Sequence, residues 1–241
     1  MSWRAFYVLA SPPGFYRFAE KAKPWLWAAF LIFGAAGLYG GLVAAPADYK
    51  QGEGYRIIFV HVPAAWMSLL IYSCMAGMGA AVLIWRGKIA AACARASVLP
   101  GASFTLITLV SGAFWGKPMW GAWWVWDARL TSELILFFLY LGYAALVFSI
   151  PERRAAARAG AMLLLVGAVN IPVIHFSVDW WNTLHQPATI AKFGAPSIHA
   201  SMLRPLLFMA AAFMAFYGAL LLTAAQAVLL EEERGAKWAR Q

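Results

Sequence analysis

Charged residues are scarce in this chain. They make up 12% of its 241 residues, whereas hydrophobic residues make up 63%. Soluble globular proteins carry about 25% charged and about 45–50% apolar residues, so the composition excludes an ordinary soluble fold. A compact core could not hide sixteen phenylalanines, thirteen tryptophans and nine tyrosines without leaving large apolar patches outside. The sequence therefore predicts an all-α protein that is integral to a membrane.

Cysteine is almost absent as well. Cys74 lies within an apolar run and Cys93 within a basic connector. Because neither belongs to a CxxC or CxxCH motif, the chain is not expected to be a thiol redox protein, to contain a disulfide framework or to attach haem c to itself. The chain also lacks the phosphate-binding pattern GxxxxGK[ST], so any ATP-driven step must come from a partner.

Six segments have the length and apolar character of membrane-spanning helices, since about 20 apolar residues cross a bilayer. They cover residues 25–45, 58–85, 97–115, 129–150, 159–176 and 203–229. Pro24 is expected to open the first helix, Pro151 to close the fourth, and the EEER run from 231 to end the sixth. The first run resembles a signal peptide, but it exceeds the usual ~7–15 apolar residues, and we interpret it as a helix. Without repeats or flexible linkers, residues 1–241 are expected to form a single membrane domain.

The net charge of +9 comes from 19 basic and 10 acidic residues. No nucleic-acid motif accompanies it, so the basic residues are read as topology signals. On one side lie Arg4, Arg17, Lys21, Lys23, Arg86, Lys88, Arg95, Arg153, Arg154, Arg158, Arg234, Lys237 and Arg240; on the other lie Lys50, Arg56, Lys117, Arg129, Lys192 and Arg204. The larger group includes both termini, which are therefore predicted to be cytoplasmic. All four histidines fall on the opposite, outer side.

Tryptophans are concentrated in the outer loop of residues 115–127, WGKPMWGAWWVWD. Five of them lie within twelve residues: Trp115, Trp120, Trp123, Trp124 and Trp126. An aromatic belt at the membrane interface is the simpler interpretation, but five so closely spaced exceed what anchoring needs. We favour an aromatic platform for a large, flat ligand. If residues 119–127 are helical, three of these tryptophans share one face.

Two histidines have surroundings that favour metal binding. His61 begins the second expected helix in RIIFVHVPAAW, with Trp66 about a turn and a half further on, and His185 lies in the outer segment VDWWNTLHQP. Neutral imidazole is a good axial ligand for haem iron, and two ligands from different segments would hold the ring from both faces. One interfacial histidine alone is more simply a hydrogen-bonded polar residue, but two beside a tryptophan cluster reverse that preference.

The remaining two histidines are not assigned to iron. His175 follows Asn170 and Pro172, and it is expected to satisfy backbone groups that the proline frees. His199 precedes the last helix, where hydrogen bonding or surface exposure is expected.

The charged residues of the outer side have two open interpretations each. Arg56, Arg129 and Lys117 suit either the propionates of a haem or anchoring at the interface. Asp127 suits capping of the fourth helix or orientation of Arg129 or a ligand histidine. Glu133 would be costly if unpaired within the bilayer, so it is expected to face protein or water, where it could pair with Arg129.

These motifs together resemble a known family. WGKPMWGAWWVWDARLTSELILFFLYLGY is similar to the WWD signature of the haem-handling proteins of cytochrome c biogenesis, and FVHVPAAWMSLL and SVDWWNTLHQPATI, with six helices in a short chain, resemble the CcmC (haem exporter protein C) family. The resemblance covers about residues 25–230. It implies His61 and His185 as axial ligands, the five tryptophans as the platform and Asp127 as the acidic end of the motif; Arg56 and Arg129 match positions linked with haem handling.

The resemblance also implies the function and the partners. Family members are not enzymes; they bind haem b at the periplasmic face of the bacterial inner membrane. They present it to the haem chaperone CcmE, which becomes covalently linked to it, and they associate with the transporter subunits CcmA and CcmB and with CcmD. Two alternatives are a b-type membrane cytochrome that retains its haem for electron transfer, and a structural transporter subunit that its tryptophans merely anchor.

Overall fold

The computed structural model describes residues 10–185, 190 and 195–240. In this part of the chain the secondary structure is helical, without strands. The helices are α2 (Pro12–Tyr39), continued by a π-helical turn at Gly40–Ala44; α3 (Ile58–Trp85), preceded by a 3-10 turn at Glu53–Ile57; α4 (Lys88–Trp120); α5 (Ala128–Ser149); α6 (Arg153–Gly167); α7 (Asn170–Trp180); α8 (Ala200–Glu232); and a last 3-10 turn at Lys237–Arg240.

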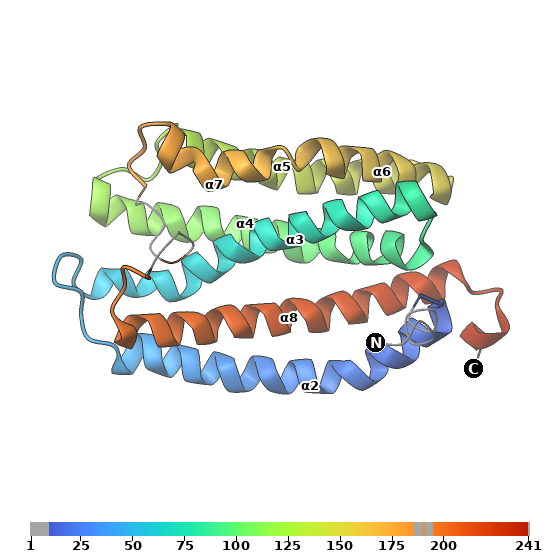
Figure 1. The fold of residues 1–241 in the computed structure, drawn as a ribbon, viewed down its shortest axis with the longest axis horizontal. Helices are drawn as coiled ribbons and strands as arrows, with labels where there is room; N and C mark the ends of the chain where they lie inside the picture. Colours follow the sequence, from blue (N-terminus) through green and yellow to red (C-terminus); the bar gives the residue numbers. More distant parts are fainter. Residues whose placement is uncertain (1–9, 186–189, 191–194, 241) are drawn as a thin grey trace.

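The helices run side by side in a bundle (Figure 1). α3 packs against α4 at the centre, and α8 packs against both of them. On one side α2 packs mainly against α8, whereas on the other side α5, α6 and α7 cover the central pair. In the described residues six spans are long and apolar enough to cross a membrane, with α6 and α7 forming one of them. The chain is therefore a multi-pass membrane protein.

Several helices are longer than the apolar runs indicated. α2 begins at Pro12, where Ser11 accepts a hydrogen bond from the amide of Gly14 (3.3 Å) and a proline occupies the first helical position. The expectation that Pro24 opens this helix is therefore wrong, because Pro24 lies inside it. By contrast, the end of α5 at Ser149, just before Pro151, and the end of α8 within the EEER run are confirmed.

The fifth span is broken between α6 and α7. A proline has no amide hydrogen, and its ring clashes with the carbonyl group four residues earlier. Pro172 lies four residues after Ala168, at the break, where Ile171 donates instead to the Ala168 carbonyl (3.1 Å). Asn170 then fixes the start of α7, because its side-chain amide donates to the carbonyl of Ser132 on α5 (2.8 Å).

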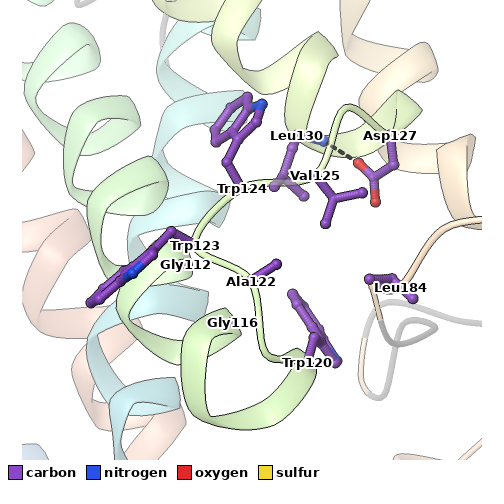
Figure 2. A pocket seen from close by; sticks show the side chains of 10 residues that line it. All are labelled: Gly112, Gly116, Trp120, Ala122, Trp123, Trp124, Val125, Asp127, Leu130 and Leu184. Carbon is purple, nitrogen blue, oxygen red and sulfur yellow. Dashed lines mark hydrogen bonds between the residues drawn. The ribbon is translucent and has the colours of Figure 1, made fainter.

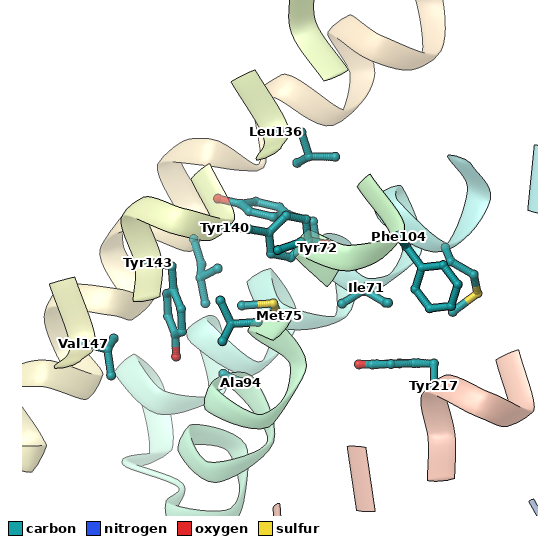
Figure 3. Packing of buried hydrophobic residues seen from close by; sticks show 14 of the residues in the cluster. Ile71, Tyr72, Met75, Ala94, Phe104, Leu136, Tyr140, Tyr143, Val147 and Tyr217 are labelled. Atoms are coloured by element: carbon teal, nitrogen blue, oxygen red, sulfur yellow. The ribbon is translucent and has the colours of Figure 1, made fainter. Parts of the chain in front are cut away.

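Glycines allow the helices to approach closely around large aromatic side chains. A Cβ atom at Gly167 would lie 2.1 Å from the hydroxyl oxygen of Tyr72, and one at Gly101 would lie 2.1 Å from Cε1 of Tyr140. The two tyrosine rings meet edge to face, with centroids 5.2 Å apart, in the buried cluster of Figure 3. Such contacts between small residues and large ones are typical of membrane helices, which gain stability from close packing.

The ends of the bundle differ in charge. The described N-terminal region, the turns at 86–87 and 150–152 and the C-terminal end of α8 lie together at one end (Figure 1). Ion pairs join Lys88 to Glu233 (2.6 Å) and Arg95 to Glu232 (3.1 Å) there. The loops of residues 45–57 and 121–127 lie at the other end, as alternation of the loops requires. Arg4 and Lys192, which were counted in the topology prediction, lie outside the described residues.

Candidate ligand-binding site

A cavity of about 490 Å³ lies at the outer-loop end of the bundle, and we call it the histidine cavity. Its volume falls within the range of about 300–1,000 Å³ that is usual for small-molecule sites. Residues of α3, α4, α5, α7 and α8 line it, together with loop residues such as Asp48 and Gln51. All four histidines contribute to its wall: His61, His175, His185 and His199.

His61 lies in the first turn of α3, where only 6% of its surface is exposed. Its Nδ1 atom lies 3.0 Å from the Oγ atom of Ser111 on α4. The Ser111 hydroxyl donates its hydrogen to the carbonyl of Ile107 (2.5 Å), which leaves its oxygen free to accept from Nδ1–H of His61. In that tautomer Nε2 of His61 keeps its lone pair, which is the form in which imidazole binds a metal.

Gly112 makes room for the same ring. A Cβ atom at this position would lie 3.0 Å from Cε1 of His61, closer than ordinary van der Waals contact. The sequence interpretation missed both Ser111 and Gly112. A Ser–Gly pair in the outer half of a helix is the available signal, but its partner becomes visible only when α3 and α4 pack together.

His185 lies next to His61, although 124 positions separate them along the chain. Their ring centroids are 6.4 Å apart, with an angle of 31° between the ring planes. Ligand nitrogens lie about 2 Å from a metal, so two imidazoles on opposite sides of one atom hold their nitrogens about 4 Å apart. Each ring centroid lies further from the metal than its ligand nitrogen does, so a centroid separation of 6.4 Å is compatible with that arrangement. The ring of Trp120 also lies near His185, with centroids 6.2 Å apart.

The five clustered tryptophans divide into two groups. Trp115, Trp120 and Trp124 line the histidine cavity, whereas the exposed fractions of Trp123 and Trp126 are 52% and 76%. Figure 2 shows Trp120, Trp123 and Trp124 pointing in different directions from the chain, and a smaller pocket lies between them. Three indoles therefore form part of the cavity wall, and two face outward.

Residues 121–127 are not helical, so the tryptophans do not share the face that a helix over residues 119–127 would give them. α4 ends at Trp120 because Gly121 adopts a left-handed conformation, with φ of 77°. α5 then begins after Asp127, whose Oδ1 atom accepts a hydrogen bond from the amide of Leu130 (2.8 Å), as the dashed line in Figure 2 shows. The capping role considered for Asp127 is thus confirmed.

Two buried polar atoms at this loop have no hydrogen-bond partner in the described part of the chain. They are Oδ2 of Asp127 and Nε1 of Trp124. A buried polar atom without a partner costs about 1–3 kcal/mol. Trp124 lines the cavity, and both residues line the smaller pocket. A polar group of a ligand, or a bound water, would satisfy these two atoms.

The charged residues take separate positions. Arg129 and Glu133 both line the histidine cavity. Nη1 of Arg129 donates to the carbonyl of Ile174 (3.4 Å), whereas Glu133 accepts from the hydroxyl of Ser68 (2.7 Å). Among the described residues they form no direct ion pair with each other, unlike the pairing considered from their spacing.

Arg56 does not line the cavity. Its guanidinium donates to the carbonyls of Gly41 (2.6 Å) and Ala45 (3.0 Å) and pairs with Glu53. It therefore caps the end of the first span and ties it to the start of the second. Lys117 does not line the cavity either, and its ammonium donates to the carbonyl of Gly121 (3.1 Å).

The two unassigned histidines have different environments. His199 caps α8, since its Nδ1 atom accepts a hydrogen bond from the amide of Ser201 (3.3 Å). Hydrogen bonding of His199 was expected and is confirmed. His175 does not take up the backbone groups that Pro172 frees, because in the described part of the chain neither of its ring nitrogens has a hydrogen-bond partner. Among the described residues its ring meets only that of Phe176, with centroids 4.7 Å apart.

The fold and the cavity define a class of protein: a multi-pass helical membrane protein with a histidine- and tryptophan-lined cavity at one end. Comparison with known proteins gives the family. The family model described as Heme exporter protein C matches residues 5–240. The chain belongs to the heme exporter protein C family.

Named relatives cover nearly the whole chain. Heme exporter protein C of Escherichia coli K12 is 45% identical over 236 residues, 98% of this chain and 95% of the relative. Heme exporter protein C of Bradyrhizobium diazoefficiens is 48% identical over 216 residues, 90% and 82% of the two chains. A putative cytochrome c biosynthesis ccmC-like mitochondrial protein of Marchantia polymorpha is 47% identical over 215 residues, 89% and 90%. The family thus handles haem for cytochrome c maturation, as a membrane component of a haem export system and not as an enzyme.

Proposed function

We propose that this protein binds haem b in the histidine cavity and presents it to the haem chaperone CcmE at the periplasmic face of the bacterial inner membrane. His61 and His185 are its axial ligands, and the haem is cargo that the protein must also release. The protein works with the transporter subunits CcmA and CcmB and with CcmD, and residues 1–241 form one membrane domain.

The observation that supports this proposal most directly is the His61–His185 pair. The two rings come from distant segments, meet with centroids 6.4 Å apart and both line a cavity of about 490 Å³. The hydrogen bond between Nδ1 of His61 and Ser111 supports ligation through Nε2. Isolated hydrogen-bonded histidines would not require such an arrangement.

The other residues of the wall suit the remaining parts of a haem. Trp115, Trp120 and Trp124 offer apolar ring surfaces to a porphyrin. Arg129 has guanidinium N–H groups beyond the one that donates to Ile174, and these suit a propionate. The unpartnered N–H group of Trp124 can donate to a propionate, whereas Oδ2 of Asp127 needs a hydrogen-bond donor such as water.

Release to the chaperone is expected to use the outward-facing part of the same loop. Trp123 and Trp126 are exposed and lie beside residues that line the cavity. A docking surface next to the cargo permits transfer without exposing the haem to water. Very tight binding would oppose this step, because each interaction that favours the held state adds to the barrier for leaving.

Replacing either ligand histidine tests the proposal. Purified His61→Ala and His185→Ala should lose most of their haem, and the absorption spectrum of any residual haem should no longer be that of a bis-imidazole complex. His199→Asn is the matched control, because His199 also lines the cavity and asparagine preserves the helix cap. Unchanged haem content and spectrum in both alanine variants would refute axial ligation by this pair.

A second measurement separates a haem carrier from a b-type cytochrome. Haem-loaded protein is incubated with purified CcmE, and covalent haem on the chaperone is measured after denaturation. A carrier transfers its haem, whereas a cytochrome keeps a stable spectrum and leaves the chaperone unloaded.

A further inference from the structure

The break in the fifth span gives its two halves different neighbours. α6 packs against both α3 and α5, whereas α7 packs mainly against α5. At the level of α7, the histidine cavity lies between this helix and α3: Ile174 and His175 line it from one helix, and Trp66 and Leu69 line it from the other. In the outer half of the bundle, the cavity therefore lies between α3 and α7.

This part of the cavity lies at membrane depth. His175 is five residues from the outer end of α7 at Trp180, about 7.5 Å along the helix axis. Trp66 is eight residues from the start of α3, about 12 Å along its axis. Trp180 and Trp181 are half exposed at the end of α7, where tryptophans usually mark the membrane interface. The part of the cavity between α3 and α7 therefore lies at the depth of the leaflet next to the outer loops.

His175 is unusual at this depth. Its side chain is exposed, lines the cavity and has no hydrogen-bond partner in the described part of the chain. An ionisable residue within the membrane is costly, and it usually marks a ligand or ion pathway. Arg129 lies next to it, because the guanidinium donates to the carbonyl of Ile174, the residue that precedes His175. An imidazole and a guanidinium thus both line this part of the cavity, together with Trp66 and Leu69.

We propose that the gap between α3 and α7 is a lateral mouth through which haem enters from the outer leaflet, with His175 as its first iron ligand. This inference rests on the proposed function of the cavity. Trp66 and Leu69 contact the ring, and Arg129 binds a propionate. Transfer inward is a ligand exchange: the bond from iron to Nε2 or Nδ1 of His175 breaks as bonds to His61 and His185 form, with the iron oxidation state unchanged.

The rate of loading tests this role of His175. Haem-free protein in lipid nanodiscs is mixed with phosphatidylcholine vesicles that contain haemin, and the bis-imidazole spectrum is followed with time. His175→Phe should load roughly tenfold more slowly, the effect of losing about 1.4 kcal/mol at the entry step. Its final spectrum should equal that of the wild type. Phe138→Leu is the control, since Phe138 is exposed on α5 and does not line the cavity.

The outcomes distinguish this inference from the proposed function. Loading of His175→Phe at the wild-type rate would overturn the role of His175. Loss of the bis-imidazole spectrum in this variant would also overturn it, because His175 would then be an axial ligand of the held haem. If the phenylalanine variant is misfolded, His175→Gln takes its place in the test. It keeps a polar side chain and should show the same slow loading. If the wild-type protein itself acquires no bis-imidazole spectrum, the proposed function fails independently of His175.

The position of the mouth is tested with bulky thiol adducts. In a background with Cys74 and Cys93 replaced by alanine, a bulky maleimide is attached to Leu69→Cys or to Lys50→Cys. Leu69 lines the cavity, whereas Lys50 lies in the first outer loop, is exposed and does not line it. The adduct at position 69 should slow loading and the adduct at 50 should not. The reverse result would place entry at the aqueous side and overturn the lateral mouth.

Discussion

At the scale of single residues, the site combines side chains that sequence patterns indicate with side chains that they do not. His61 and His185 were selected by their tryptophan-rich surroundings, and they meet across the cavity. Ser111 and Gly112 were not selected, because their importance depends on which α4 residues face the His61 ring. Periodicity identifies the buried face of a helix, but it does not identify the atom that a neighbouring helix presents to it.

Ser111 is expected to orient His61 for ligation. Ser111→Ala removes the acceptor for Nδ1–H, so the ring is no longer held with Nε2 as the ligand atom. Haem affinity in detergent should fall by about 10–100-fold, the usual effect of losing such a support to a metal ligand. Haem titration followed by absorption measures it.

Two further variants complete this test. Ser111→Thr keeps the hydroxyl and should bind haem nearly as the wild type does. Ser73→Ala removes an exposed serine hydroxyl of α3 that donates only to its own helix, and it should have no effect. An affinity of Ser111→Ala equal to that of Ser73→Ala would contradict the orienting role.

At the scale of elements, the existence of the helices followed from hydropathy but their lengths did not. Apolar runs report the part of a helix that lies in lipid, whereas α2 and α4 continue into polar sequence at the basic end of the bundle.

Proline had opposite effects at two positions. Pro24 is accommodated within α2, but Pro172 follows a break, and Asn170 holds the new start through its bond to α5. Such tertiary bonds decide where a proline interrupts a helix.

The close approach of α3 and α6 depends on Gly167. In Gly167→Ala the new methyl group would lie 2.1 Å from the Tyr72 hydroxyl, so the helices must separate or the tyrosine must move. The free energy of unfolding should fall by about 1–3 kcal/mol, as overpacking usually costs. Thermal unfolding in detergent measures this change. Gly77→Ala is the control, because nothing lies within 4 Å of a Cβ atom there, and equal stability of the two variants would contradict the packing argument.

The loop of residues 121–127 is expected to separate holding haem from passing it on. Trp123→Ala and Trp126→Ala remove exposed rings, so they should reduce covalent loading of CcmE several-fold more than they reduce bound haem. Trp120→Ala is the comparison, because Trp120 lines the cavity and its loss should lower haem content first. Haem content and chaperone loading are measured on the same preparations. Parallel losses of both in Trp123→Ala would show that this ring mainly holds the ligand.

At the scale of the whole molecule, composition was sufficient to predict the class. The scarcity of charge and six apolar runs indicated a multi-pass membrane protein, and six helices of suitable length are found in the described residues. The arrangement of those helices was not predictable in the same way. Hydropathy gives no information on which helices touch, so the peripheral position of α2 against α8 and the separation of α7 from α3 required the structure.

Orientation in the membrane is a prediction for the whole molecule. Both termini are expected to be cytoplasmic because thirteen basic residues fall on their side and six on the other. In a cysteine-free background, Lys117→Cys should react with a membrane-impermeant thiol reagent in spheroplasts, whereas Lys237→Cys should react only after lysis. Both positions are exposed, so accessibility does not bias the comparison. Labelling of position 237 alone in unbroken spheroplasts would reverse the topology.

The division of the clustered indoles into three on the cavity wall and two on the outer surface has an optical consequence. A porphyrin in the cavity absorbs where tryptophan fluoresces, so it should quench the nearest rings most strongly. Departure of the cargo would then brighten the emission of the whole cluster, since even the exposed Trp126 lies against Trp124, with ring centroids 5.4 Å apart. The unlabelled chain thus carries a fluorescent reporter of its own occupancy.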